Sequence, residues 1–256
     1  MKSDHNDNIN SGLFRYQTAA EPNFSGINNL NMTESNLKSY NDSIARKIFK
    51  VTTSMYGKVS DITVLDFGAG TGTIAKILRN KYDIKSDCVE LDPILKKSLE
   101  SNGFITSSKL EELQLQYDVI YTSNVLEHIT NDQETIEKLK KYLKYGGCLI
   151  VYVPAFPILY SYMDKKIGHV RRYRKKDLVD KIEMGGFKVQ KVTYDDAIGF
   201  FVSLMLKTFK LDRIESINST VTLKIYDRSI YPISRILDLI GMKFIVGKNI
   251  LLVASK

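Results

Sequence analysis

The chain has 256 residues, of which 43% are hydrophobic and 26% are charged, and its formal net charge is +8. This length can bury one large core, so we expect one domain with insertions rather than two domains. The charge permits an anionic partner without identifying one. The first residues lack the apolar stretch of a secretory signal. Cys88 and Cys148 fall in predicted core strands, so we expect free thiols in a reducing, cytoplasmic compartment.

The chain order begins with a polar lead-in. Residues 1–31 contain seven asparagines and almost no periodic apolar positions, so we predict a flexible segment there and a folded domain over 32–256. Apolar residues then recur at helical spacing before the first predicted strand. They are Leu37, Tyr40, Ile44, Ile48 and Phe49.

A glycine-rich turn follows the first predicted strand, Ile62–Phe67, and precedes a predicted helix. Its sequence, Gly68-Ala69-Gly70-Thr71-Gly72, lets the backbone turn tightly and bring N–H groups close to a ligand at a helix N-terminus. The next strand, Cys88–Glu90, ends in a carboxylate where a ribose diol is held in doubly wound folds. This pattern predicts an adenosine-bearing cofactor.

The charge at this turn favours one cofactor over another. A dinucleotide fingerprint places its third glycine one residue later than Gly72. Asp66 would repel a pyrophosphate, whereas it would attract the cationic sulfonium and amino group of S-adenosylmethionine (SAM). We therefore predict SAM.

The remaining pattern alternates strands and helices, which indicates a parallel sheet with helices on both faces. A helix containing Ile136, Leu139 and Leu143 is predicted to start at Asn131 and stop at Gly146-Gly147. The other predicted strands are 104–106, 117–122, 148–154, 187–194 and 250–254. Residues 195–247 are long for a connection, so we expect a helical cap before the last strand. Its apolar part, Ala197–Leu206, is either a buried cap helix or a wall facing a lipid substrate or a membrane surface; we favour the buried helix.

The glycine turn, Glu90 and the sequence Asn124–His128 together resemble the class I SAM-dependent methyltransferases, in the branch that includes ubiquinone-type O-methyltransferases. Gly168–Tyr173 and Gly247–Ala254 are similar to an uncharacterised bacterial and archaeal group associated with lipid-linked glycan assembly. The resemblance implies a Rossmann-like α/β fold with a seven-stranded mixed sheet of order 3-2-1-4-5-7-6. It also implies cofactor-binding residues, which are Asp66, Gly68, Ala69, Gly70, Glu90, Leu91, Asp92, Leu110 and Asn124.

Two of the three histidines are candidates for chemistry. His128 follows the fourth predicted strand and His169 follows the fifth, at the edge where open α/β sheets bind ligands. An imidazole suits the removal of a proton from an acceptor oxygen. A structural role for His128, as a hydrogen-bonding anchor of its loop, is an equal alternative. No metal site is predicted.

A run of basic residues surrounds His169. Seven lysines and arginines lie between Lys165 and Lys176 without an intervening acid. Such a run is usually a solvated face. Its place after the fifth strand instead suggests that Arg171, Arg172 and Tyr173 bind an anionic acceptor.

These observations predict a SAM-dependent methyltransferase acting on a small or lipid-linked acceptor, at oxygen, with peripheral membrane contact as one option. One alternative is an RNA methyltransferase that holds phosphates with the basic run. Against this alternative, the sequence lacks an aromatic–basic platform for bases and the motif of amino-methylating enzymes. Another is a non-catalytic SAM-binding partner or sensor.

Overall fold

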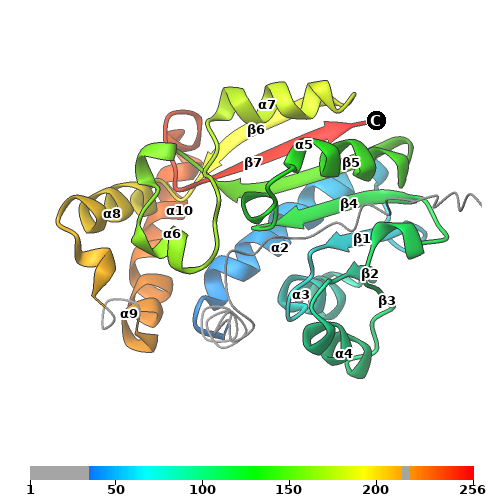
Figure 1. Cartoon of the computed structure of the whole chain (residues 1–256), viewed down its shortest axis with the longest axis horizontal. Helices are drawn as coiled ribbons and strands as arrows, with labels where there is room; N and C mark the ends of the chain where they lie inside the picture. The colour runs from blue at the N-terminus through cyan, green and yellow to red at the C-terminus, as the bar shows by residue number, and fades with distance from the viewer. Residues whose placement is uncertain (1–34, 215–218) are drawn as a thin grey trace, which may run out of the picture.

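The computed structural model describes residues 35–214 and 219–256, which form one seven-stranded sheet with helices on both faces (Figure 1). The predicted flexible segment, 1–31, and His5 lie outside these residues. The strands are β1 (Val64–Phe67), β2 (Ser86–Val89), β3 (Thr106–Ser107), β4 (Tyr117–Ser123), β5 (Leu143–Pro154), β6 (Lys188–Asp195) and β7 (Asn249–Ser255). Their order is β3-β2-β1-β4-β5-β7-β6, and β7 alone runs antiparallel to its neighbours within this sheet. This confirms the predicted fold.

The helices divide between the two faces of the sheet. They are α2 (Lys38–Tyr56), α3 (Thr73–Tyr82), α4 (Pro93–Ser101), α5 (Asp132–Lys141), α6 (Tyr162–Lys166), α7 (Lys175–Met184), α8 (Ala197–Thr208), α9 (Thr220–Ile225) and α10 (Tyr231–Leu239). Helices α5 and α7 cover one face, and α2 and α3 cover the other.

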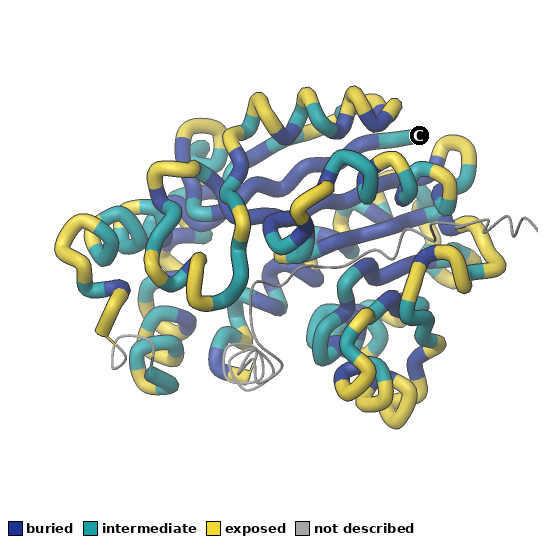
Figure 2. The backbone as a smooth tube through the Cα atoms, viewed as in Figure 1, coloured by how far each residue is buried: buried dark blue, intermediate teal, exposed yellow. Residues whose placement is uncertain are grey.

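The core follows the alternation of side chains along each strand. In β5, Leu149 and Val151 pack with α5 and α7, whereas Ile150 and Tyr152 pack with α2 and α3. The strands other than β3 and β6 are therefore buried along most of their length (Figure 2). Ile44 and Ile48 of α2 are buried, as their spacing predicted. Cys88 and Cys148 are buried and free, which confirms that prediction.

One predicted boundary is wrong. Helix α5 ends at Lys141 rather than at Gly146-Gly147, and Leu143 begins β5 opposite Tyr117. The backbone N–H of Tyr117 donates to Tyr142 O at 2.8 Å, so the residues from Tyr142 onward pair with β4 instead of continuing the helix. Leu143 is buried in the strand and would also fall on the apolar face of a longer helix, which is why apolar periodicity did not distinguish the two.

Residues 196–248 connect β6 to β7, and the described part of this segment contains α8, α9 and α10. They lie together at one end of the molecule, on the left in Figure 1, beyond the last residue of β6. In the described part of the chain, no helix combines the length and the hydropathy needed to cross a membrane.

Candidate active site

The glycine turn leaves the carboxyl end of β1 in a left-handed backbone conformation. Gly68, Gly70 and Gly72 have φ angles of 79°, 57° and 75°. An L side chain rarely adopts such angles, which explains three glycines at alternate positions. The N–H groups of Gly68 and Ala69 donate to Val89 O at 2.9 and 3.1 Å, so the turn is fixed against the end of β2.

The turn also packs closely against its surroundings. A Cβ atom added to Gly68 would lie 2.4 Å from Val125 Cγ2, in the segment that follows β4. One added to Gly72 would lie 2.5 Å from Leu99 Cδ2 of α4. Both distances are too short for a carbon–carbon contact, so these positions have no room for a side chain.

Glu90 ties this turn to the tip of β2. Its Oε2 accepts a hydrogen bond from Gly70 N at 2.7 Å, and its Oε1 accepts one from Asp92 N at 2.9 Å. Burial raises the pKa of Glu90, and the two backbone donors oppose that rise. Asp92 caps α4 by accepting from Ile94 N and Leu95 N. The predicted carboxylate therefore lies beside the predicted turn.

The other predicted cofactor residues have different surroundings. Asp66 is buried, and its Oδ2 accepts from the Tyr121 hydroxyl at 2.8 Å. Leu110 is buried, Leu91 is exposed, and Asn124 is exposed with a φ of 55°. The turn offers backbone without side chains, and we expect Glu90 and Asp66 to supply carboxylates for a diol and a cation. This arrangement fits SAM.

A second group of side chains forms where the loops after β4 and β5 meet. Glu127 and His128 lie in a short 3₁₀ turn (η2, Leu126–His128), and His169 follows α6. The rings of His128 and His169 are 4.7 Å apart, edge to face. The structure thus brings together the two histidines that the sequence singled out, although they are 41 residues apart in the chain.

His169 is held by a hydrogen bond to an aspartate that the sequence did not reveal. Its Nδ1 lies 2.7 Å from Asp164 Oδ1, and the same oxygen accepts from Arg172 Nε at 2.8 Å. Burial alone would raise the pKa of Asp164, but the His169 hydrogen bond and the Arg172 charge hold it well below its usual range. The carboxylate is therefore ionised and accepts, so Nδ1 of His169 donates and Nε2 is left as an acceptor.

Glu127 is the least satisfied member of this group. It is fully buried, and neither carboxylate oxygen has a hydrogen-bond partner among the described residues. Its Oε1 lies 3.7 Å from His169 Nε2. Burial raises the pKa of Glu127 to about 8, and burial lowers the pKa of His128 to about 4. Both groups are thus mainly neutral near pH 7.

The same three side chains could also hold a metal ion. Glu127, His128 and His169 each offer a ligand atom, and these atoms lie within 4.8 Å of one another. Carboxylate and imidazole are ligands for zinc and iron. The Asp164 bond to His169 has the form of a carboxylate that orients a metal-bound imidazole. The sequence analysis did not predict this cluster.

The residues predicted to bind the acceptor face internal aspartates. Arg171 NH1 lies 2.8 Å from Asp132 Oδ1, and Arg172 pairs with Asp164. The Tyr173 hydroxyl donates to Asp132 Oδ2 at 2.8 Å and is buried. The two bonds to Asp132 join the loop after β5 to the start of α5, whereas the Arg172 bond lies within the segment after β5. Whether the three residues also touch an acceptor stays a prediction.

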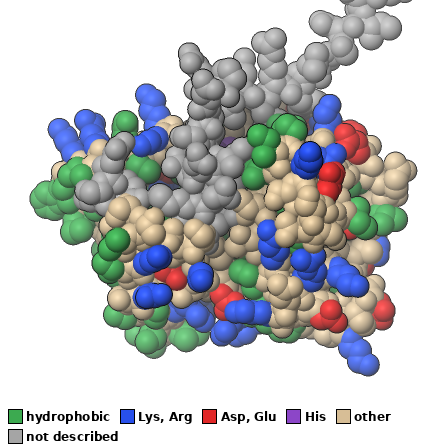
Figure 3. All heavy atoms as spheres, turned by 90° about the horizontal axis from the view of Figure 1, so that it is seen from below, with side chains coloured by type: hydrophobic (Ala, Val, Ile, Leu, Met, Phe, Trp, Pro, Cys, Tyr) green, Lys and Arg blue, Asp and Glu red, His purple; other side chains and the backbone are tan. Residues whose placement is uncertain are grey.

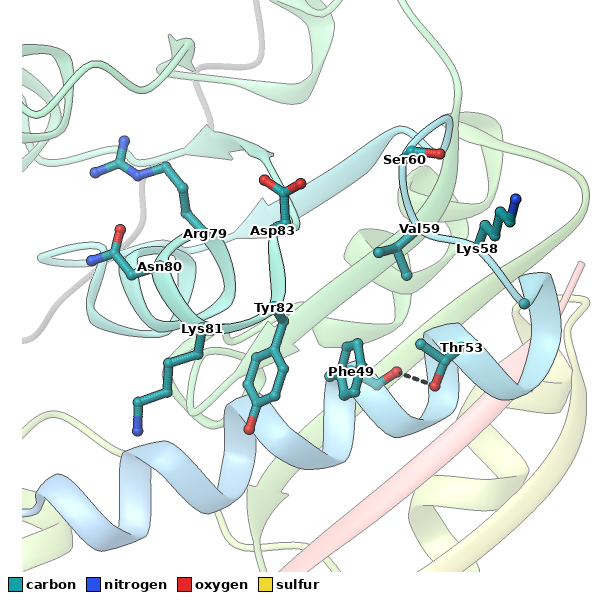
Figure 4. Close-up of a pocket in the computed structure, with 11 residues that line it drawn as sticks. Phe49, Thr53, Lys58, Val59, Ser60, Arg79, Asn80, Lys81, Tyr82 and Asp83 are labelled. Atoms are coloured by element: carbon teal, nitrogen blue, oxygen red, sulfur yellow. Dashed lines mark hydrogen bonds between the residues drawn. The ribbon is translucent and has the colours of Figure 1, made fainter.

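A separate surface pocket lies at the opposite edge of the sheet. It is formed by the ends of α2 and α3 and by the segment before β1, and its lining includes Phe49, Tyr82 and Arg79 (Figure 4). The Phe49 and Tyr82 rings stack with their centroids 4.3 Å apart. Because it adjoins the amino end of β1, this pocket is distinct from the glycine turn at the carboxyl end.

Comparisons with known proteins agree with this geometry. A family model described as a methyltransferase domain matches residues 40–192, more than half of the chain. The chain is 35% identical over 106 residues to the ubiquinone biosynthesis O-methyltransferase of Rickettsia bellii (strain OSU 85-389). That match covers 38% of this chain and 44% of the relative, so it spans less than half of the relative's length.

Solved structures share the fold at low sequence identity. A SAM-dependent methyltransferase from Archaeoglobus fulgidus superposes with a TM-score of 0.51 and 20% identity, covering 82% of this chain and 94% of that one. The phosphoethanolamine N-methyltransferase 2 of Haemonchus contortus, in complex with SAM, gives a TM-score of 0.53 at 12% identity. The match covers 82% of this chain and 52% of that one. The chain belongs to the class I SAM-dependent methyltransferases. Membership of this family agrees with the predicted SAM-dependent enzyme.

Proposed function

We propose that the protein methylates an oxygen atom of a small or lipid-linked acceptor and that His169 accepts the hydroxyl proton. When bound, SAM supplies the methyl group: its S–CH₃ bond breaks, the electron pair stays on sulfur, and a new O–CH₃ bond forms. The protein must orient the acceptor oxygen in line with that bond and remove its proton.

The observation that carries this proposal is the 2.7 Å contact between His169 Nδ1 and Asp164 Oδ1. An ionised carboxylate fixes the ring and its tautomer, which leaves the Nε2 lone pair to accept a proton. It also stabilises the imidazolium that forms. This arrangement lies at the carboxyl edge of the sheet, as the glycine turn does.

His128 is the second candidate at this position. Its lowered pKa keeps it neutral near pH 7, so it adds no positive charge beside the sulfonium. A neutral imidazole can accept a hydrogen bond from an acceptor hydroxyl. We infer that His128 orients the acceptor and that His169 takes the proton.

An anionic acceptor receives less support. Arg171 and Arg172 are already paired with Asp132 and Asp164, and the Tyr173 hydroxyl is bonded to Asp132. An acidic group would have to share Arg171 with Asp132. We infer that these three residues mainly position the loop that carries His169.

The test is methyl transfer to a panel of phenols, polyprenyl phenols and carboxylic acids, measured as release of S-adenosylhomocysteine. We expect His169→Gln to lower kcat by about 10²-fold or more, because general bases contribute about that much. Asp164→Asn should lower kcat and move the pH profile, while the affinity for SAM is unchanged.

Tyr160→Phe is the matched control. The Tyr160 hydroxyl donates to His169 O at 2.7 Å, so this variant disturbs the same loop without altering the imidazole. Full activity of His169→Gln on an oxygen acceptor would refute the assignment of the base. Methylation restricted to nitrogen or carbon acceptors would refute the oxygen specificity.

A further inference from the structure

Helix α10 exposes most of its large aliphatic side chains to solvent and buries the polar side chains of Ser234 and Asp238. Four large aliphatic side chains are more than half exposed, and Leu239 and Ile240, at the end of the helix, are each 76% exposed. The others are Ile233 and Ile236, so the set follows helical spacing along one face. We call this set the apolar face of α10. A helix packed on a core normally shows the opposite arrangement.

Hydrogen bonds fix this orientation. Asp238 accepts from Asp196 N at 2.8 Å, and Ser234 Oγ accepts from Ile198 N at 2.9 Å. Both side chains are buried and satisfy N–H groups at the start of α8. Rotating α10 to bury its isoleucines would break these bonds, so the outward apolar face is built into the fold.

Helix α8 adds a second row of exposed apolar side chains. Phe201, Met205 and Phe209 recur every four residues and are 54%, 47% and 69% exposed. α8 and α10 pack against each other, and the short turn after α10 exposes Phe244. Such a concentration of large apolar groups marks a surface that contacts another phase or molecule.

The exposed charge on these elements is all positive in the described residues. Asp212, Asp227 and Asp238 are each buried and accept backbone hydrogen bonds. The exposed charged side chains are four lysines and arginines, which are Lys210, Arg213, Lys224 and Arg228. Figure 3 shows hydrophobic and basic side chains together at the left end of the molecule, where these helices lie.

We propose that α8, α9 and α10 dock on the surface of an anionic lipid bilayer. The apolar side chains would enter the boundary of the acyl chains, and the basic side chains would contact lipid phosphates, as in interfacial helices. Charge complementarity favours this occupant, because the described residues of these elements expose cations and no acids, which matches an anionic surface. Lysine and arginine stems also extend along such a boundary.

The docking surface is connected to the candidate active site. The ring centroid of Phe200 in α8 lies 5.0 Å from that of Phe156, which follows β5, and Lys207 Nζ donates to Ile158 O at 2.6 Å. The same loop after β5 carries Asp164 and His169. Resting on the proposed function, an acceptor anchored in the bilayer would therefore meet the catalytic loop at the membrane surface.

The experiment is co-sedimentation of the full chain with phosphatidylcholine vesicles that contain or lack phosphatidylglycerol, without any acceptor. We expect binding to the anionic vesicles that weakens as salt is added. Ile236→Gln with Leu239→Gln should weaken binding about tenfold or more. Lys224→Ala with Arg228→Ala should remove the preference for phosphatidylglycerol.

Met184→Gln with Ile105→Gln is the matched control, because these residues are 73% and 71% exposed on other parts of the surface. This control should bind like the wild type, and SAM affinity by calorimetry should be equal in all variants. Equal vesicle binding by the α10 variant would overturn the proposal. So would a light-scattering dimer that the α10 variant abolishes while no form of the protein binds vesicles. Failure to methylate oxygen would leave vesicle binding unaffected, so the two proposals fail separately.

Discussion

A buried carboxylate without a hydrogen-bond partner is costly when it is ionised. Glu127 is such a group among the described residues, and burial raises its pKa from 4.5 to about 8. Between these values the unfolded chain releases a proton that the folded protein keeps. The free energy of unfolding therefore falls as pH rises through this window.

We predict that Glu127→Gln removes this pH dependence. In buffer that contains a metal chelator, the free energy of unfolding of the wild type should fall by up to about 4 kcal/mol relative to that of the variant between about pH 4.5 and about pH 8. Denaturant unfolding of both proteins at several pH values measures this difference. Parallel stability curves would show that Glu127 ionises in the fold without penalty.

The hydroxyl that holds Asp66 gives a second prediction. Tyr121→Phe removes a buried hydrogen bond from a carboxylate beside the glycine turn. We expect a loss of about 1–3 kcal/mol in the free energy of unfolding and weaker SAM binding by calorimetry.

Tyr117→Phe is the control for that variant. The Tyr117 hydroxyl is bonded to Asp87 at 2.9 Å, and the residue is as buried as Tyr121 but lies at the other end of β4. It should cost similar stability with unchanged SAM affinity. Equal SAM affinity in all three proteins would show that the orientation of Asp66 does not matter to the cofactor.

The glycine turn provides the test at the level of an element. Gly68→Ala forces an L residue to a φ of 79° and places its Cβ 2.4 Å from Val125. The turn must then move from Glu90 or push on the loop after β4, so we expect the affinity for SAM to fall more than tenfold.

Gly103→Ala separates strain from collision. Its φ is 75°, but nothing lies within 4 Å of the added Cβ. It should cost about 1 kcal/mol of stability and leave SAM binding intact. A similar loss of binding in both variants would mean that destabilisation, and not the shape of the turn, controls the affinity.

The sequence predicted those elements whose side chains follow a simple period. The strand order was implied by the resemblance to class I methyltransferases. The position of Glu90 beside the glycine turn was predicted because a general rule places ligands at the carboxyl ends of parallel strands. The end of α5 was not predicted correctly, because an apolar residue at position 143 fits the periodic pattern of a helix and that of a strand equally well.

The second half of the site was harder to predict. His128 and His169 were found by their position after strands, but Asp164 was not. Its contact with His169 depends on the path of α6 and the loop that follows, which no periodic pattern encodes. Glu127 lay within the recognised motif, yet its burial became visible only in three dimensions.

At the scale of the molecule, one edge of the sheet gathers every candidate function. The glycine turn, Glu90, the loops after β4 and β5, and the start of α8 all follow the carboxyl ends of strands. The surface pocket that contains Phe49 lies at the other edge and shares none of these residues.

The position of β7 has a consequence for synthesis of the protein. It is the last strand of the sheet in sequence, yet it lies between β5 and β6, and β6 pairs with it along the full length of the strand. The part of the sheet that contains the glycine turn, β1 to β4, can thus form while the chain is still emerging. By contrast, β6 and the helices before β7 can pack only after β7 has been synthesised. In ribosome-bound chains stalled before residue 249 emerges, we expect a protease to cut 188–248 readily and to spare 62–142. Equal protection of both segments would show that the late strand is not needed to hold them.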